Sequence, residues 1–199
     1  MKRFFASFGL LLFCAGCSMF SSSPPPPKTW MVSPDVGPTV QSAMEGLQPA
    51  FPVTRLGSVT VNAPYDRTPF VIHRSDGSVV ADPMNVFAAT PASLLRAPIK
   101  SHLSADGRFG TVVGQSSVAG AEATVETTVT DFSLDCTQAG ARKARVKLNL
   151  DVVKTGRGPR TIALKGEGAG EADAGTGDYS EAFSTAFSSA FQEALRALK

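Results

Sequence analysis

The sequence predicts an α/β protein of the mixed α+β kind, in which one mixed, largely antiparallel β-sheet is packed by an internal helix and a long C-terminal amphipathic helix. Three observations support this prediction. Apolar and polar residues alternate from Val146 to Val152, which is the period of a half-buried strand. Asp76-Gly77 separates two strand-like runs as a tight turn would. An apolar stripe with helical spacing runs from Phe183 to Leu198.

The size of the chain suits one such domain. It has 199 residues, of which 43% are hydrophobic, and domains usually contain about 100 to 200 residues. No long internal linker separates a second core. We therefore expect a single globular domain over residues 29–199, and the length excludes a large multidomain enzyme.

The first residues have the organisation of a secretion signal, which we assign to residues 1–16. Lys2 and Arg3 form a charged start, and an apolar run from Phe4 to Phe13 follows. This run is shorter than the roughly 20 apolar residues that a membrane-crossing helix needs. The small residues Ala15-Gly16 then precede Cys17. The segment therefore predicts export and removal of the signal.

Cys17 is the predicted site of lipidation. A lipoprotein signal peptidase needs small side chains before the cysteine, although Cys14 stands where Leu is common. Two or more acyl chains, such as palmitate, anchor a protein stably. The alternative is an ordinary cleaved signal that releases a soluble protein. Since Ser18 rather than Asp follows Cys17, we expect delivery to the outer membrane, facing the periplasm, if the cell has two membranes.

Residues 17–28 form the predicted tether, which comprises the acylated cysteine and a Ser/Pro-rich stretch. Pro24 to Pro27 favour an extended left-handed helix, so the stretch should be a stiff stalk that lifts the domain roughly 30 Å. We expect a first strand at Trp30 to Val32. The weak helical pattern between Pro34 and Pro52 leaves that segment undecided.

The next elements are a strand, a hairpin and a helix. Alternation over residues 59–63 predicts the strand, and residues 69–74 and 78–81 flank the Asp76-Gly77 turn. Thr90 before Pro91 is typical of a helix start. The apolar face of this helix comprises Leu94, Leu95, Ile99, His102 and Leu103. An interior proline costs about 3 kcal/mol, so we expect a kink or two short turns at Pro98.

The second half of the sequence predicts four strands and a final helix. Strands are expected at residues 109–115, 125–136, 146–152 and 162–164, the last ones pairing antiparallel. The inward-facing phase slips within the second of these, which predicts a bulge near Thr130-Asp131. Asp178 and Glu181 have the spacing of a capping box. The glycine-rich residues 166–177 are interpreted as a mobile loop rather than a phosphate-binding loop, because the P-loop Lys-Ser/Thr pair is missing.

The sequence gives little support for catalysis, and we predict neither an enzyme nor a cofactor. After the signal is removed only His73 and His102 remain as histidines, and neither has a supporting motif for nucleophilic catalysis or for a metal site. The acidic residues at 171, 173 and 178 do not have EF-hand spacing. Cys136 is then the only free thiol, and we expect it to be buried and inert.

Charge excludes one class of partner. The chain has 19 Lys+Arg and 17 Asp+Glu, and Lys2 and Arg3 account for the whole excess. Without a basic majority the domain is not expected to bind nucleic acid in general.

Two sets of residues have alternative interpretations. Phe183, Phe187 and Phe191 can pack a core, which is the commoner arrangement, or line a lipid groove. Tyr65-Asp66-Arg67 can contact a partner, but a carboxylate that caps the turn and pairs with Arg67 is the simpler interpretation.

The region from Val59 to Val113 resembles the ABC-type transport auxiliary lipoproteins, the paraquat-inducible-protein-C-like partners of MCE lipid-transport systems. The motifs that carry the resemblance are Pro64-Tyr65-Asp66-Arg67 with 70–74, Asp82-Pro83-Met84-Asn85-Val86-Phe87, Pro91-Ala92-Ser93-Leu94-Leu95, and Asp106-Gly107-Arg108-Phe109 with Val112-Val113. The turn is one residue shorter than in the family, Val86 replaces a frequent arginine, and Pro98 is unusual. The order of the remaining elements also fits.

This resemblance implies a non-catalytic docking protein. It implies a membrane-anchored periplasmic component that docks an MCE-family protein and, indirectly, an inner-membrane ABC permease and ATPase that move lipids or other apolar molecules between the envelope membranes. Tyr65, Asp66, Arg67 and Phe87 are the residues we expect to contact that partner or to shape the contact surface. A homo-oligomeric ring is compatible with the resemblance. The alternative is a general outer-membrane scaffold or assembly lipoprotein.

Overall fold

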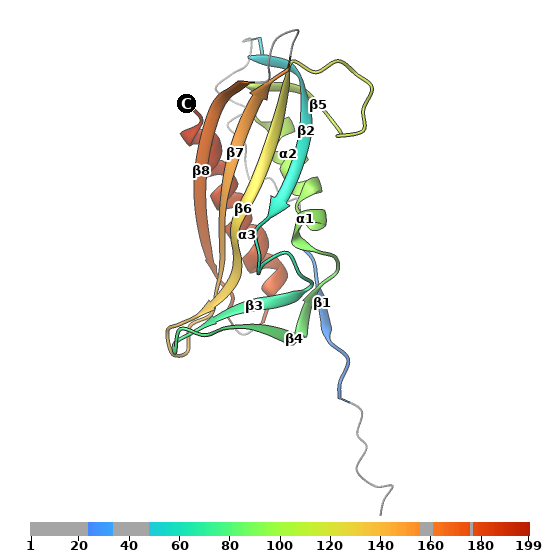
Figure 1. Cartoon of the computed structure of the whole chain (residues 1–199). Helices are drawn as coiled ribbons and strands as arrows, with labels where there is room; N and C mark the ends of the chain where they lie inside the picture. The colour runs from blue at the N-terminus through green and yellow to red at the C-terminus, as the bar shows by residue number, and fades with distance from the viewer. Residues whose placement is uncertain (1–23, 34–47, 156–160, 176) are drawn as a thin grey trace, which may run out of the picture.

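The computed structural model describes residues 24–33, 48–155, 161–175 and 177–199. They form one mixed sheet of eight strands with its helices on one face, as Figure 1 shows. The elements follow the order β1 (Lys28–Trp30), β2 (Phe51–Val61), β3 (Pro69–Arg74), β4 (Val79–Phe87), α1 (Pro91–Leu94), α2 (Arg96–Ala105), β5 (Phe109–Val113), β6 (Ala123–Cys136), β7 (Lys143–Lys154), β8 (Thr161–Asp173) and α3 (Tyr179–Ala197). The predicted fold class is confirmed.

The long strand β6 organises the sheet. Strand β7 pairs antiparallel along one edge of β6, whereas β2 and β3 share the other edge, one after the other, and both run parallel to β6. Strand β5 extends the sheet beyond β2, and the hairpin partner β4 extends it beyond β3. The sheet is therefore mixed, and its longest pairings, β6–β7 and β7–β8, are antiparallel.

Several elements lie where the sequence predicts them. The β3–β4 hairpin turns at Gly77, which has a φ of 80°. The register of β6 against β7 shifts between Val129 and Asp131, so the predicted bulge is confirmed. Strand β2 starts at Phe51, earlier than expected, because it pairs there with Phe109 of β5. Strand β1 covers residues 28–30 rather than 30–32, since its partners are residues 85–87 of β4.

Pro98 is accommodated by a break before it. Helix α1 ends at Leu94 and α2 begins at Arg96, so Pro98 lies in the first turn of α2. Backbone N–H groups in a first turn have no partner within the helix, and a proline there loses no helical hydrogen bond. The prediction of two short helical pieces is confirmed.

The glycine-rich run is a strand, and the mobile-loop prediction for its first part is wrong. Gly166, Gly168 and Gly170 lie at alternate positions of β8 and face α3. A Cβ atom on Gly168 would lie 1.9 Å from the carbonyl oxygen of Ala190, and the other two would lie 2.1 Å from those of Ala194 and Ala186. The glycines are present because α3 packs directly on the backbone of β8.

The spacing of the two elements explains this close fit. Two residues advance a strand by about 6.6 Å, and four residues advance a helix by about 6 Å. Glycines two residues apart on β8 therefore meet alanines four residues apart on α3, which runs in the opposite direction. Small side chains on both sides let the helix approach the sheet closely.

The core lies between the sheet and α3. Phe183, Phe187 and Phe191 are each at most 1% exposed and pack with rings of the sheet and of α2. The interpretation of these rings as the lining of a lipid groove is therefore wrong for this structure. Among the described residues, no helix combines the length and apolar character that a membrane crossing needs.

Both ends of α3 are fixed to the domain. At its start the Asp178 carboxylate accepts a hydrogen bond from the backbone N–H of Glu181 at 3.1 Å, as the predicted capping pattern requires. At its end the Arg108 guanidinium donates to the carbonyl of Leu195 at 2.8 Å and pairs with Asp106 at 2.7 Å. The backbones of Lys199 and Lys165 then exchange two hydrogen bonds, so the C-terminal residue covers part of the edge of β8.

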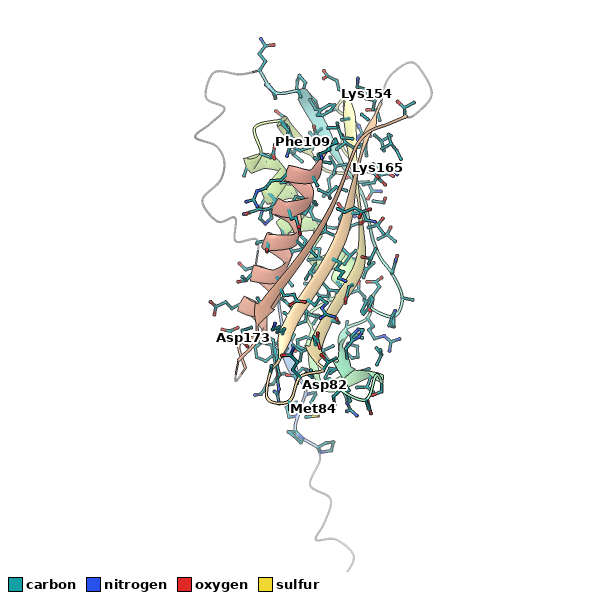
Figure 2. All side chains as sticks on the ribbon, turned by 90° about the vertical axis from the view of Figure 1, so that its left-hand side faces the viewer. Asp82, Met84, Phe109, Lys154, Lys165 and Asp173 are labelled. Atoms are coloured by element: carbon teal, nitrogen blue, oxygen red, sulfur yellow. The ribbon has the colours of Figure 1, made fainter. Side chains whose placement is uncertain are left out.

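The first strand attaches the N-terminal segment to the domain. Trp30 donates its indole N–H to the Asn85 side chain at 3.0 Å and packs edge-on against the Tyr179 ring. The backbone N–H of Ser33 donates to the Ser184 hydroxyl on α3 at 2.8 Å. Residues 24–27 lead into this strand at the end of the molecule that carries Asp82 and Met84, whereas Phe109 and Lys154 lie at the other end (Figure 2).

Candidate functional site

The predicted partner-contact residues occupy the connection between β2 and β3. A cis peptide bond joins Ala63 to Pro64, and the backbone N–H of Tyr65 donates to the carbonyl of Asn62 at 2.9 Å. The backbone of this tight turn directs the side chains of Tyr65, Asp66 and Arg67 to three different environments. Each of them therefore has a separate role.

Tyr65 lies over the face of the sheet that the helices leave open. Its hydroxyl is 3.2 Å from Nε2 of His73, and the two rings stack. Burial raises the pKa of Tyr65, and the negative charge of Asp131 raises it further, while Arg145 opposes the shift. The phenol therefore stays protonated at neutral pH and cannot act as a base.

The same open face carries an ion-pair network across three strands. Arg145 of β7 pairs with Asp135 of β6 and donates from Nε to Glu171 of β8 at 3.0 Å. Lys143 lies 3.7 Å from Glu171. Each cation in this network faces a carboxylate, so the network links β6, β7 and β8 and leaves little net charge for a ligand.

Asp135 should make folding sensitive to acid. Burial alone raises the pKa of Asp135, but hydrogen bonds from Thr137 and the charges of Arg145 and His73 outweigh it, and the pKa lies below its usual 3.8. A carboxyl with a lowered folded-state pKa adds stability above its unfolded pKa and loses it as the pH falls through the folded value. Asp135→Asn should therefore lose less stability than wild type between pH 7 and about pH 3.

Urea unfolding at the two pH values measures this difference. Glu167→Gln on the open face of β8 is the matched control and should keep the wild-type pH dependence. An Asp135→Asn chain whose unfolding midpoint falls as steeply as that of wild type would show that this network does not set the acid sensitivity.

Asp66 joins two of the sequence motifs that lie far apart in the chain. Its carboxylate accepts a hydrogen bond from the backbone N–H of Ala92, in the first turn of α1, at 3.2 Å. The expected pairing of Asp66 with Arg67 is wrong, because no described ion pair links them and the carboxylate is directed to the helix instead. Asp66 thus positions α1 against the β2–β3 turn.

Arg67 is the member of the turn that remains available. Its side chain is exposed, and no hydrogen bond or ion pair to a described residue holds it. It borders a shallow depression of about 440 Å³ whose other walls are Val61, Ala63, Pro64, Asp66 and Pro69. Of the predicted contact residues, Arg67 is therefore the one that a partner can reach as a free charge.

Phe87 has a structural role only. It is 3% exposed, and its ring centroid lies 4.4 Å from that of Phe70 and 5.1 Å from those of Phe132 and Phe183. Its backbone N–H donates to the carbonyl of Thr68 at 2.7 Å, which holds the end of the β2–β3 turn. The Phe87 ring therefore lies beneath the β2–β3 turn and is not accessible at the surface.

A second pair of cations, the half-buried Arg96 and the exposed Lys100, follows α1 and was not identified from the sequence. Arg96 and Lys100, one helical turn apart on α2, line a depression of about 500 Å³ together with Leu56, Ala97 and residues 114–116. They occupy the polar side of the predicted amphipathic helix. Spacing alone did not distinguish them from ordinary solvent-facing residues.

Each histidine contacts one hydroxyl group: Nε2 of His73 lies 3.2 Å from the Tyr65 hydroxyl, and Nε2 of His102 lies 3.2 Å from the Ser188 hydroxyl of α3. His73 pairs in register with Asp135 on the open face, whereas the next residue of β6, Cys136, points to the opposite face because side chains alternate along a strand. His102 is buried between the rings of Phe187 and Phe191. Within the described ranges, no group of three or more His, Cys, Asp or Glu side chains is arranged to hold a metal ion.

Cys136 is half-buried rather than fully buried, because it is the last residue of β6 and lies at the mouth of a hairpin. Burial raises the pKa of its thiol, although the positive charge of Arg142 opposes this. The thiolate is therefore a minor species at neutral pH, as expected for an unreactive cysteine.

Comparisons with known proteins identify the fold. No protein-family model and no curated protein matches the chain. The crystal structure of protein XCC0632 from Xanthomonas campestris, of the family DUF330, is similar with a TM-score of 0.60 and 12% identity, over 82% of this chain and 88% of that one. The crystal structure of an uncharacterized protein is similar with a TM-score of 0.57 and 17% identity, over 86% and 96%. At these identities the likeness shows the fold alone.

Proposed function

We propose that this protein is a non-catalytic lipoprotein, anchored in the outer membrane on its periplasmic side, that serves as an auxiliary component of an ABC/MCE-type transport system. Such a system moves lipids or other apolar molecules between the envelope membranes. The observation that carries the proposal is the order of the N-terminal features: a charged start, a short apolar run, small residues before Cys17, and a Ser/Pro tether. This order joins a folded domain directly to a membrane anchor.

Features of the domain support a docking role rather than a chemical one. Its aromatic core is closed, the histidine that contacts a serine hydroxyl, His102, is only 3% exposed, and the charges of its open-face ion pairs balance. Motifs of the lipoprotein family that it resembles meet where Asp66 binds the N-terminus of α1. This arrangement supports a preformed surface for a protein partner.

The mass of the native protein tests the anchor. We expect the mature chain, extracted from membranes with detergent, to begin at Cys17 and to carry a diacylglyceryl group and an amide-linked acyl chain. Cys17→Ser should remove these groups and release the protein from the membrane fraction, because no acyl chain remains to hold it. A native chain with an unmodified N-terminus would contradict the proposal.

Copurification tests the transport role. An affinity-tagged chain, extracted from envelopes with mild detergent, should retain an MCE-family protein encoded in the same organism. Reproducible retention of a different envelope complex, with no MCE protein, would instead favour the alternative of a general scaffold or assembly lipoprotein. A folded chain with His73→Gln and His102→Gln should retain the partner as wild type does, because docking needs no catalytic histidine.

A further inference from the structure

Two shallow depressions lie at the two ends of helix α1. The first is bordered by Arg67 and adjoins the start of α1, where Asp66 binds Ala92. The second begins immediately after α1, at Arg96. Strand β2 contributes to both, through Val61 in the first and Leu56 in the second. The depressions therefore belong to one surface along β2, on the side of the sheet that carries the helices (Figure 1).

This surface carries more positive than negative charge, because Arg67, Arg96 and Lys100 outnumber the single carboxylate of Asp66. No carboxylate is among the described residues that line the depression beside α2. Arg96 donates only to the neutral Gln115 amide, at 2.9 Å, and keeps further N–H donors. The side chains of Lys100 and Arg67 are exposed and make no hydrogen bond or ion pair to a described residue. The Asp66 carboxylate accepts a hydrogen bond from the first turn of α1 and keeps its negative charge.

No large hydrophobic side chain is exposed on this surface, and its apolar lining comes from small residues such as Ala63, Pro64 and Ala97. Leu56 and Val61 are buried, with 4% and 7% of their surface exposed. The exposed large hydrophobic residues of the described chain lie elsewhere: Met31, Val79, Met84, Val118 and Ile162. Charge complementarity on this surface would give a ligand specificity and a fast association rate.

We infer that Arg67, Arg96 and Lys100 form a docking surface for an acidic, extended segment of a partner protein. Arg96 and Lys100 lie four residues, or roughly 6 Å, apart along α2, which about two residues of an extended segment would span. Alternate carboxylates of such a segment point to one side and can reach successive cations. The identity of the partner rests on the proposed function, whereas its acidic chemistry rests on these three residues.

A peptide probe tests the chemistry on the full mature chain in detergent. We expect a fluorescein-labelled decapeptide of alternating Glu and Ser to bind, and the Gln-Ser peptide of the same length not to bind. Fluorescence anisotropy should show at least about tenfold weaker binding at about 500 mM than at about 50 mM NaCl, because salt screens exposed charges. The triple variant Arg67→Glu, Arg96→Glu, Lys100→Glu should lose binding.

A matched variant controls for net charge. Lys147→Glu, Lys154→Glu, Lys165→Glu changes three exposed lysines of β7 and β8 and should keep the peptide affinity of wild type. Equal binding of the Glu and Gln peptides, or equal loss in both triple variants, would overturn the inference. A third result would also overturn the inference. If the Glu peptide does not bind, and the Cys17→Ser chain floats with phosphatidylglycerol vesicles in a way that depends on the same three cations, the surface binds lipid headgroups instead.

Copurification separates this inference from the proposed function. If wild type retains no MCE-family protein but binds the acidic peptide, the proposed function fails and the docking chemistry stands. If wild type and the Arg67/Arg96/Lys100 variant retain the MCE protein equally, the function stands and this surface is not its docking site. We expect retention by wild type and by the lysine control, and its loss in the Arg67/Arg96/Lys100 variant.

Discussion

Alanine in place of Gly168 should destabilise the domain by at least about 3 kcal/mol, at or beyond the upper end of the usual effect of overpacking. The added Cβ would lie 1.9 Å from the carbonyl oxygen of Ala190 and 2.6 Å from the backbone nitrogen of Ala194. Both atoms belong to the backbone of α3, so no side-chain rotation relieves the clash. Urea unfolding monitored by circular dichroism should show a much lower midpoint or no cooperative transition.

Gly120→Ala is the matched control, since its added Cβ meets no atom within 4 Å. It should remain within about 0.5 kcal/mol of wild type, as surface substitutions usually do. A Gly168→Ala chain as stable as Gly120→Ala would mean that α3 does not pack on β8 at this distance.

Removing the ring of Phe183 should have the second large effect, a loss of about 3 to 5 kcal/mol, which is typical of Phe→Ala in a core. The Phe183 side chain is 1% exposed, and its ring centroid lies 4.9 Å from that of Phe132 and 5.2 Å from that of Phe70. It therefore connects α3 to β6 and β3 at once. Equilibrium unfolding in urea measures the loss.

Two further variants make this result specific. Phe183→Leu, which leaves a smaller cavity, should be intermediate, and Ser189→Ala on the exposed side of α3 should be nearly neutral. Unchanged stability of Phe183→Ala would mean that the ring faces solvent or a lipid ligand rather than the core.

Local patterns in the sequence predicted most of the elements. Alternation identified β7, and a slip of that alternation located the bulge of β6, because the buried face of a strand fixes the phase of its apolar residues. The glycine run misled for a physical reason. The run was interpreted as a mobile loop, whereas in β8 its glycines leave room for the backbone of α3 because they have no Cβ atom. That role depends on a helix that begins only at Tyr179.

The candidate site was predictable only in part. The motif Tyr65-Asp66-Arg67 marked the correct turn, but the sequence did not reveal that its three side chains diverge. The contact of Asp66 with Ala92 joins positions 26 residues apart, and no local pattern encodes such a contact. Arg96 and Lys100 gained significance only when the fold placed α2 beside β2 and left their charges unopposed.

The attachment of β1 determines how the domain would respond to mechanical load. Strand β1 runs parallel to β4 through three paired positions, and residues 24–27 continue from its start. Tension applied through these residues acts along the strand, so it loads the backbone bonds together in shear instead of opening them one by one. Displacement of β1 along β4 would also break the hydrogen bond of the Trp30 indole to Asn85 and its contact with the Tyr179 ring. If the protein is anchored as proposed, a force between the anchor and a bound partner would be resisted where the tether joins the sheet.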